Sequence, residues 1–518
     1  MERRLTVFKR IISVVLFAAI LLFTFTRYGY VMRTRNGESN HITGITEVDN
    51  VDVVFVGTSA TYTSWLPYRA WDEYGITSYD YATSISMIGA EVGTIRYIQH
   101  RQPDTKLYVI DIRSYLKSDG DGHIPVAKTN TMSYSFDRIY TILDCYNLIE
   151  DKSTVGSPLN HIFDILANQS NREALGDDNN WSYINNDVPS KYLGCDIISK
   201  HMVVDEPPAW VEDEANVGAY AERSIRHLLE YAQKNDIEIL FTLIPYGITE
   251  EQIKKANRME KIIEEYDGNY LNMCSNHAPY DVDYSKEFYN PRHVNILGAQ
   301  KYTHYLGKYI LDNFDIADHR GDEKYAEWDT YLEDAYKAEA KAEKEIEESI
   351  QRKAENSAFM ANLSDTDDFY EWFNRASLAE DLSIFMVAHG SVPKVTGDTE
   401  NLFSNLGFAD EKKDYYHWIS SCGDIDDADK DTVEGTIDAR ESNWTVTQTN
   451  DAGSIVIDGR ECSLQKNGIN VVAWDDNKAE IVDLFTLVSD GNGGLKIERG
   501  ELPEADNIVD TPESDDSE

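Results

Sequence analysis

The chain has 518 residues, of which 92 are Asp or Glu and 48 are Lys or Arg, so its formal net charge is -44. This length predicts roughly two or three domains, and an apolar fraction of 42% supplies their cores, which excludes a chain that is disordered throughout. The acidic balance argues against a nucleic acid partner, because phosphate binding requires clustered Lys and Arg.

The N-terminal region, residues 1–35, starts with a basic end and continues with the uncharged apolar run Ile11–Thr26. These sixteen residues are fewer than the usual span of about 20, but Arg27 can reach the interface and Tyr28 and Tyr30 are suited to it. A cleaved signal peptide is the alternative. Because no A-x-A-like cleavage site follows, we expect a signal anchor, a single-pass protein of the cell membrane, and an extracytoplasmic location for the rest of the chain.

Between residues 50 and 315, short apolar runs alternate with amphipathic stretches, which predicts an α/β domain with a three-layer, doubly wound parallel sheet. The predicted strands are 51–56, 78–82, 106–112, 237–244 and 270–273. The predicted helices are 66–74, 89–101, 219–235, 250–266 and 298–312. Residues 119–217 have a weak, polar pattern and are expected to form an insertion, such as a lid or a specificity region.

The first predicted strand ends in Gly57-Thr58-Ser59. In an α/β fold this break lies at the carboxyl end of the sheet, where ligands bind. A serine beside a glycine that permits a sharp turn is a candidate nucleophile. The alternative is a turn with a helix-capping hydroxyl, since Ser and Thr are common caps.

A serine nucleophile needs a base, and among the 12 histidines His293 has the most informative context. It lies in Asn290-Pro-Arg-His293-Val-Asn-Ile-Leu-Gly298, a loop that follows the last predicted strand and leads into a helix. His293 is therefore expected at the same edge of the sheet as Ser59. A capping or core role is the alternative for a single histidine.

The strand-Gly-Thr-Ser segment and the Asn-Pro-Arg-His loop together resemble the SGNH/GDSL hydrolase superfamily, in particular its membrane-anchored branch of D-alanyl transfer and alginate acetylation proteins. The resemblance implies that Ser59 is the nucleophile, that its backbone N–H is one oxyanion donor, and that His293 is the general base. It also implies a tight turn at Gly57. The other two oxyanion donors of the superfamily, a glycine and an asparagine, are not matched in this chain, whose corresponding loops carry Ser84 and Arg113 as support residues.

The carboxylate position is a further departure from the pattern of the superfamily. Its carboxylate lies three residues before the histidine, where this chain has Asn290. An amide can orient the imidazole but cannot stabilise an imidazolium. Asp283 and Glu287 in the same loop are alternative carboxylates.

The chain beyond residue 315 divides into three regions. Residues 322–357 are rich in Glu, Lys and Ala and predict a solvated spacer helix. Residues 365–500 predict a smaller α+β module, with strands at 382–388, 453–457, 468–474 and 479–485 and a short helix at 401–407. The acidic tail, residues 501–518, is expected to be disordered.

The stretch from Gly453 to Phe485 resembles the interleukin-like EMT inducer domain, although the segment similar to its second part, Ile384–Gly407, comes first, which suggests a circular permutation. The resemblance implies glycan binding. Trp418, Trp444 and Trp474 are candidates for stacking on sugar rings, while burial in a core is the commoner role of tryptophan. Any small β-rich module is the alternative.

Five cysteines (Cys145, Cys195, Cys274, Cys422 and Cys462) form no CxxC motif, so a cysteine metal site is not expected, and neither another metal nor a cofactor is predicted. Cys422 and Cys462 lie 40 residues apart in the same module, where we predict a disulfide.

The expected function is that of a membrane-anchored extracytoplasmic serine esterase or O-acyltransferase. Its substrates would be acyl esters of cell-envelope glycans, and a membrane-bound O-acyltransferase is a candidate partner. The alternative is a catalytically degenerate surface protein that binds glycan or assembles envelope complexes.

Overall fold

The structure, a computed structural model, describes residues 2–501 apart from 34–40, 43, 85–87, 118–121, 123, 125, 177–189, 275–279, 392, 394–415, 421–422, 426–431, 438–439, 441, 449–451 and 493. The chain forms two compact units. The first contains residues 1–200 and 205–344, and the second contains residues 201–204 and 345–518. The acidic tail from residue 502 and the helix predicted at 401–407 lie outside the described residues.

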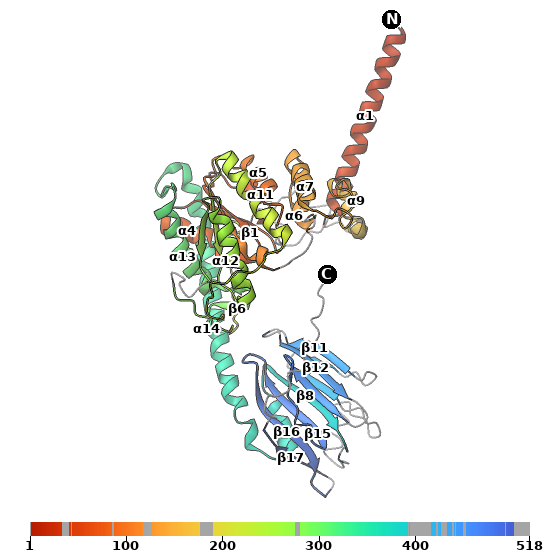
Figure 1. Ribbon diagram of the computed structural model, residues 1–518, viewed down its shortest axis with the longest axis vertical. Helices are drawn as coiled ribbons and strands as arrows, with labels where there is room; N and C mark the ends of the chain where they lie inside the picture. Colours follow the sequence, from red (N-terminus) through yellow and green to blue (C-terminus); the bar gives the residue numbers. More distant parts are fainter. Residues whose placement is uncertain are drawn as a thin grey trace. The chain divides into compact units, whose positions relative to one another are not determined.

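The first element is the long helix α1 (Glu2–Val31), which stands out from the α/β domain in Figure 1. Its segment Val7–Val31 is long and apolar enough to cross a membrane, and the most apolar part of this segment is not buried by the rest of the protein. The helix extends beyond the predicted run Ile11–Thr26 on both sides. It is consistent with single-pass anchoring, while the orientation of the chain stays a prediction.

The α/β domain contains a five-stranded parallel sheet in the order β2-β1-β3-β4-β5. Its strands are β1 (Val53–Gly57), β2 (Ser78–Ala82), β3 (Leu107–Asp111), β4 (Ile239–Leu243) and β5 (Asn269–Asn272). All five lie where the sequence predicts them, within two residues at the ends. The strand order reverses between β1 and β3, and ligands bind at the carboxyl ends of the strands at such a point.

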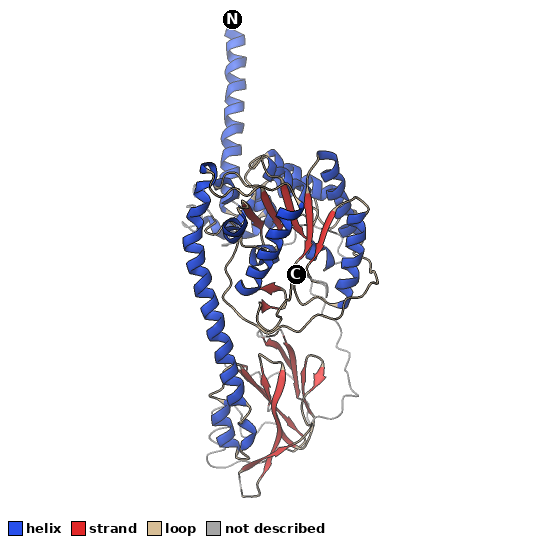
Figure 2. Ribbon diagram, turned by 90° about the vertical axis from the view of Figure 1, so that its left-hand side faces the viewer, coloured by secondary structure: helices blue, strands red, loops and turns tan. Residues whose placement is uncertain are grey.

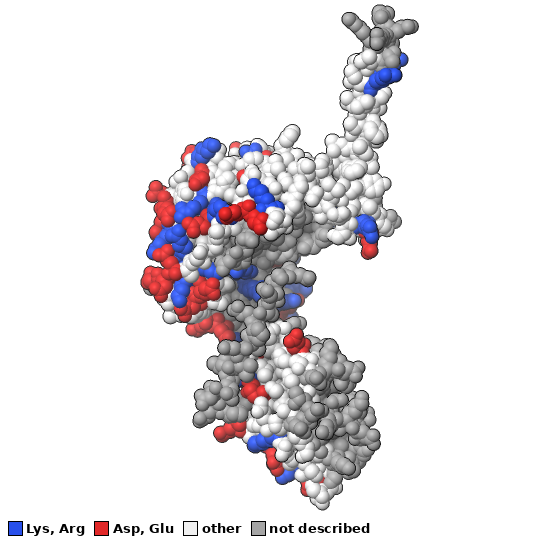
Figure 3. All heavy atoms as spheres, turned by 45° about the vertical axis from the view of Figure 1, so that its right-hand side comes forward, with Lys and Arg blue, Asp and Glu red and all other residues white. Residues whose placement is uncertain are grey.

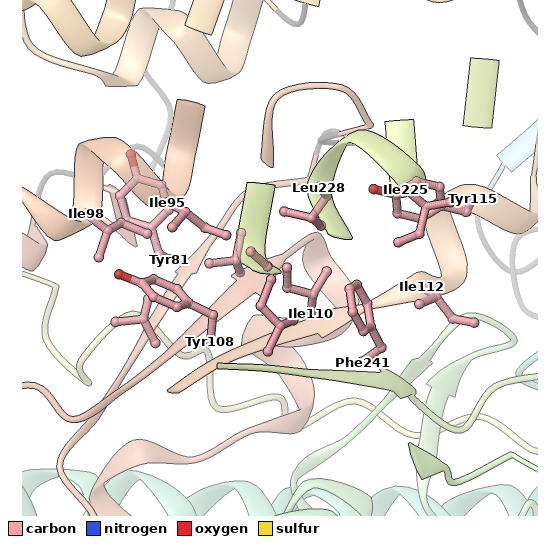
Figure 4. Close-up of a cluster of buried hydrophobic side chains, with 14 of the residues drawn as sticks. Tyr81, Ile95, Ile98, Tyr108, Ile110, Ile112, Tyr115, Ile225, Leu228 and Phe241 are labelled. Carbon is pink, nitrogen blue, oxygen red and sulfur yellow. The ribbon is translucent and has the colours of Figure 1, made fainter. Parts of the chain in front are cut away.

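Helices cover both faces of this sheet, as Figure 2 shows. Successive side chains of each strand point to opposite faces, and those of β1, β2, β3 and β4 are buried on both, so the sheet has one apolar core on each side. Val54 and Val56 of β1 face α5 (Glu91–Gln99), α11 (Ala219–Asn235) and α12 (Glu250–Glu264) in the larger core, part of which Figure 4 shows. Val53 and Phe55 face the opposite core, which includes residues of α3 (Ser59–Ser64), α4 (Pro67–Tyr74) and α13 (Ile296–Asn313).

Two elements near the expected site were not predicted. The helix α3 begins at Ser59, directly after the β1 turn. A two-stranded antiparallel pair, β6 (Phe288–Asn290) and β7 (His293–Val294), precedes α13. Both elements are too short to show a periodic pattern in the sequence.

The insertion at residues 119–217 contains helices rather than an irregular loop. They are α6 (Val126–Thr131), α7 (Phe136–Leu148), α8 (Leu159–Ile162), α9 (Asp164–Ala167) and the 3-10 helix η3 (Gln169–Gly176). Three further 3-10 helices in the first unit are η1 (Gly44–Glu47), η2 (Ile112–Leu116) and η4 (Glu323–Tyr331).

The charged segment 322–357 forms η4 and most of α14 (Leu332–Met360), as predicted, but its first part is not a solvated spacer. Trp328 and Glu339 are buried, and the Glu339 carboxylate accepts a hydrogen bond of 2.7 Å from the Tyr68 hydroxyl and pairs with Arg69. The prediction failed because a buried charge with partners cannot be told from a solvated one in the sequence.

The second unit is a β-sandwich with helices on one outer face. One sheet has the order β10-β9-β8-β15-β16-β17 and the other β11-β12-β13-β14. The first comprises β8 (Leu382–His389), β9 (Tyr416–Ser420), β10 (Gly423–Ile425), β15 (Gly468–Asp475), β16 (Glu480–Ser489) and β17 (Leu495–Arg499). The second comprises β11 (Thr432–Ile437), β12 (Ser442–Gln448), β13 (Gly453–Ile457) and β14 (Arg460–Glu461).

Alternate residues of β8 divide the interior of this unit into two cores. Phe385 and Val387 pack against strands of the second sheet. Ile384 and Met386 pack on the other side, against α15 (Phe369–Ala376) and the 3-10 helix η5 (Leu363–Asp365). The four predicted strands correspond to β8, β13, β15 and β16.

Candidate active site

Ser59 is positioned by the turn that joins β1 to α3. Gly57 ends β1, and a Cβ atom at this position would lie 1.9 Å from Oγ1 of Thr61, so any other residue would require the Thr61 side chain to move. Ser59 is the first residue of α3. Its backbone N–H therefore belongs to a helical first turn, in which N–H groups have no intrahelical acceptor.

His293 is positioned by the β6–β7 pair, in which it is the register partner of Asn290. The pair is held in place by Asn295, which is fully buried. Its Nδ2 donates to the backbone oxygens of Lys286 and Phe288 at 2.8 and 3.2 Å, while its Oδ1 caps α13. Asn295 is thus a positioning residue.

The nucleophile and the base expected from the sequence are in contact. Oγ of Ser59 lies 2.6 Å from Nε2 of His293, although 234 positions separate them in the chain. On the other side of the ring, Nδ1 of His293 lies 2.9 Å from Oδ1 of Asn290. The three side chains form a continuous Ser–His–Asn series.

The direction of these hydrogen bonds follows from a backbone group. Oδ1 of Asn290 also accepts a hydrogen bond of 2.9 Å from the N–H of Arg292, which can only donate. The side-chain atom of Asn290 at this point must therefore be its oxygen, so Nδ1 of His293 carries the proton and Nε2 is the acceptor that faces Ser59. This is the tautomer that a general base requires.

The alternative carboxylates lie in the same loop, but their contacts are elsewhere. Glu287 is buried, pairs with Lys301 and accepts a hydrogen bond of 3.0 Å from the N–H of Asp283. Asp283 accepts hydrogen bonds from Ser285. The partner of the imidazole is Asn290.

Ser59 and His293 open onto a cavity of about 560 Å³ at the carboxyl end of the sheet. Ser84, which follows β2, and Arg113, which follows β3, line the same cavity, so the structure brings together both expected support residues and the Ser–His pair. Lys117, Arg292 and Tyr246 also line it, and none of them was a site residue expected from the sequence.

The surroundings of His293 disfavour its charged form. Burial lowers the pKa of His293 to about 3, and the positive charges of Arg113, Lys117 and Arg292 act in the same direction. The imidazole is therefore neutral at physiological pH, as a base must be. The same surroundings oppose the imidazolium that forms when the base takes a proton.

Arg113 connects β3 with the histidine loop. Its Nε donates to Oδ2 of Asp111 at 3.1 Å, and its Nη1 donates to the backbone oxygen of Arg292. The guanidinium also lies over the Tyr246 ring, 4.9 Å from its centroid. Among the described residues, no group of three or more His, Cys, Asp or Glu is arranged to hold a metal ion.

The candidate glycan platform of the second unit is not formed by the two tryptophans whose side chains are described. Trp444 and Trp474 are 2% and 7% exposed and lie in the sandwich core. The side chain of Trp418 and the whole of Cys422 lie outside the described residues. Cys462, the predicted disulfide partner of Cys422, is buried as a free thiol.

No protein-family model, no curated protein and no solved structure matches this chain. The function must therefore be inferred from the site itself.

Proposed function

We propose that the protein is a serine hydrolase or acyltransferase of the SGNH/GDSL type, with Ser59 as nucleophile, His293 as general base and Asn290 as the residue that orients the base. The observation that carries this proposal is the Ser59–His293 contact of 2.6 Å at the mouth of a cavity, with Nε2 as the accepting nitrogen. Capping or core packing of either residue would not require this pairing.

The proposed reaction has two halves. Oγ of Ser59 attacks an acyl carbonyl while Nε2 of His293 takes the hydroxyl proton, and the backbone N–H of Ser59 supports the oxyanion. The tetrahedral intermediate collapses, and His293 returns the proton to the departing alcohol. Water or a sugar hydroxyl then attacks the acyl-enzyme with His293 again as base. The bond between the acyl group and Oγ of Ser59 breaks, and His293 returns the proton to Oγ, which completes hydrolysis or transfer.

The proposed setting is the extracytoplasmic face of the membrane, where α1 would anchor the chain, with acyl esters of cell-envelope glycans as substrates. The candidate membrane span supports the anchoring. The glycan is proposed from the superfamily resemblance.

A second candidate function is a binding protein with an SGNH-like fold and no turnover. The observation that favours it is Asn290, because the imidazolium would form among three cations and its partner on Nδ1 is an amide in place of a carboxylate. The rate of a working enzyme is therefore expected to be low.

Turnover of 4-nitrophenyl acetate by the full chain in detergent separates the two candidates. We expect measurable hydrolysis that disappears in Ser59→Ala and in His293→Ala. Ser114→Ala removes another hydroxyl from the cavity wall and should leave the rate within about threefold. Equal background rates in the wild type and Ser59→Ala, with the fold intact, would contradict the proposal.

A further inference from the structure

The charge of the cavity wall is opposite to that of the protein. Three basic side chains line the cavity: Arg113, Lys117 and Arg292. None of its described lining residues is Asp or Glu, although the chain contains 92 acidic residues. A cavity lined by basic side chains is therefore not explained by the overall charge of the protein, which is strongly negative.

The basic groups of the wall lie close enough together to repel one another. Asp111, which is buried beneath the wall, pairs with Arg113. Burial lowers the pKa of Lys117, and the neighbouring charges of Arg113 and Arg292 lower it further. Like charges are thus held together at a cost, which a bound anion would relieve.

We propose that this site acts on anionic substrates, in which a carboxylate or phosphate lies close to the reacting ester and contacts Lys117 and Arg292. This inference rests on the proposed function and adds the charge of its substrate. The anionic group belongs either to the acyl chain or to the alcohol that leaves.

The bound anion would also compensate for Asn290. A carboxylate next to the imidazole normally offsets the positive charge that forms on it. Here the negative charge of the substrate would reduce the combined field of the three cations on His293. Turnover should therefore depend on a charge that the substrate brings with it.

Two matched pairs of esters test the proposal with the full chain. For the acyl side they are 4-nitrophenyl hydrogen glutarate and its methyl ester, and for the alcohol side 4-acetoxybenzoate and its methyl ester. The quantity measured is the ratio of kcat/KM for the anionic ester to that for the neutral ester. Intrinsic reactivity cancels when this ratio is compared between variants.

We expect the ratio to fall by about tenfold or more in Lys117→Gln/Arg292→Gln for at least one pair, and the affected pair identifies the side that carries the charge. Lys152→Gln, which removes an exposed lysine outside the cavity, should leave both ratios unchanged. Ratios that are the same in the wild type and the double variant for both pairs would overturn the proposal.

Binding to Ser59→Ala separates this inference from the proposed function. Isothermal titration with glutarate and dimethyl glutarate reports the cationic wall without any chemistry. Binding of glutarate alone, lost in the background of Lys117→Gln/Arg292→Gln, supports the anion site even if no ester is turned over. Turnover without glutarate binding or charge discrimination would contradict the anion site and leave the hydrolase intact.

A second, independent observation concerns the surface beside α1. Among the residues that the structure describes outside α1, most exposed large apolar side chains lie on α7, α8, α9 and their junctions. We call this group the juxtamembrane apolar surface, and it consists of Phe136, Ile139, Leu143, Leu159, Phe163 and Leu166. Phe136 is 90% exposed. On α7, Phe136, Ile139 and Leu143 are spaced by three and four residues and therefore lie along one side of the helix, while the other three belong to the short helices α8 and α9 and the junction between them.

The same segment holds the end of α1. The buried guanidinium of Arg33 donates to the backbone oxygens of Asn130 and Met132 at 2.6 and 3.0 Å. Asn171 donates to the backbone oxygen of Met32 at 2.9 Å, and the Tyr134 hydroxyl to that of Thr26 at 3.3 Å. The juxtamembrane apolar surface therefore begins next to residues of the candidate membrane span.

Charge follows the same division. In Figure 3 the side of the domain next to α1 is almost without Lys, Arg, Asp or Glu atoms, whereas its opposite flank is densely charged. A surface that is apolar, uncharged and continuous with a membrane span fits the boundary between headgroups and acyl chains.

We infer that the juxtamembrane apolar surface inserts into the lipid interface and fixes the α/β domain against the membrane. The test replaces Phe136 by the photoreactive residue p-benzoylphenylalanine in the full chain. The protein is reconstituted in vesicles of phosphatidylglycerol and phosphatidylethanolamine in equal parts. Leu378, which is 76% exposed in the second unit, carries the same probe as the matched control.

After irradiation we expect phospholipid adducts at position 136 and none at position 378. A crosslink to a second copy of the chain, in place of lipid, would overturn the inference. A second outcome would also overturn it: no lipid adduct in vesicles, together with a protein adduct at position 136 in native membranes. A protein partner would then cover the surface.

Discussion

The two units differ in where they place the side chains that would suit a functional site: at a cavity in the first unit and in the core in the second. In the α/β domain, residues from distant parts of the chain, Ser59 and His293, meet at the edge of a cavity. In the β-sandwich, the aromatic residues that would suit a sugar site, Trp444 and Trp474, lie in the core. The proposed chemistry therefore lies at the carboxyl edge of the parallel sheet, whereas the described tryptophans of the sandwich contribute to its packed core.

The largest expected effect is on the α/β side. His293→Ala removes the acceptor of the Ser59 proton, and kcat/KM for ester hydrolysis should fall by about 10³-fold or more. Steady-state kinetics with the full chain measure this. An unchanged rate in a folded variant would show that ester hydrolysis does not occur at this edge of the sheet, and the contrast between the two units would no longer hold.

On the sandwich side, Trp444→Ala should lower the free energy of unfolding of the module by about 3–5 kcal/mol, because it leaves a cavity in a packed core. The indole also fills the space beside Gly435, where a Cβ would lie 2.6 Å from the ring. Chemical denaturation gives the loss, and Leu378→Ala, at an exposed site, is the control, expected within about 0.5 kcal/mol.

Turnover by the folded fraction of Trp444→Ala should equal that of the wild type. A variant that keeps its stability but loses binding to an envelope glycan would assign the indole to a site instead of the core.

Asn290→Asp tests whether the missing carboxylate limits the rate at the candidate site. A carboxylate beside Nδ1 stabilises the imidazolium, so turnover on a neutral ester should rise at least about tenfold, equivalent to ~1.4 kcal/mol. If substrates bring their own negative charge, the gain on an anionic ester should be smaller. A gain that is the same on both esters would argue against that compensation.

The pH profile of the same variant gives a second readout. In the wild type the pKa of His293 is lowered to about 3, so the base is neutral across the physiological range and the rate should not fall between about pH 8 and pH 5. The carboxylate introduced by Asn290→Asp raises the pKa of His293, so the acid limb should move upward. A wild-type rate that falls through about pH 6.5 would show that the imidazole is exposed and unperturbed.

The smallest effect concerns Asp476 in the sandwich. Burial raises its pKa to about 7, and the nearby carboxylates of Asp381 and Asp475 add to the shift. Between the unfolded value and about pH 7 the folded module binds more protons than the unfolded chain, so its stability is present at low pH and is lost as pH rises through 7.

We therefore expect the module to lose about 1–2 kcal/mol between pH 5.5 and pH 8 from this group, a loss that Asp476→Asn should remove. Denaturation at the two pH values measures it. The same loss in the wild type and in Asp476→Asn would place its origin in another group.

The sequence predicts the fold of the α/β domain well, because β1, β3 and β4 are nearly continuous apolar runs bounded by turn residues. The bounds of β2 and α11 agree with the prediction at both ends. The helix α3 escapes prediction because Ser59–Ser64 is rich in Ser and Thr, which favour caps over helix interiors.

The candidate site is only partly predictable. Ser59 and His293 follow from sheet topology, since both come after the carboxyl ends of strands. Lys117 does not, because a lysine that directly follows the short 3-10 helix η2 carries no pattern. The same limit explains Glu339, whose burial depends on Tyr68 and Arg69, about 270 positions away in the chain.

The most direct test of the central claim is covalent labelling by a fluorophosphonate, which reacts with an activated serine. The full chain is treated in detergent, digested, and the adduct is located by mass spectrometry. The account predicts a single adduct on the peptide that contains Ser59, absent in Ser59→Ala and strongly reduced in His293→Ala. A folded protein that takes up no label, or an adduct at another serine that persists in Ser59→Ala, would contradict it.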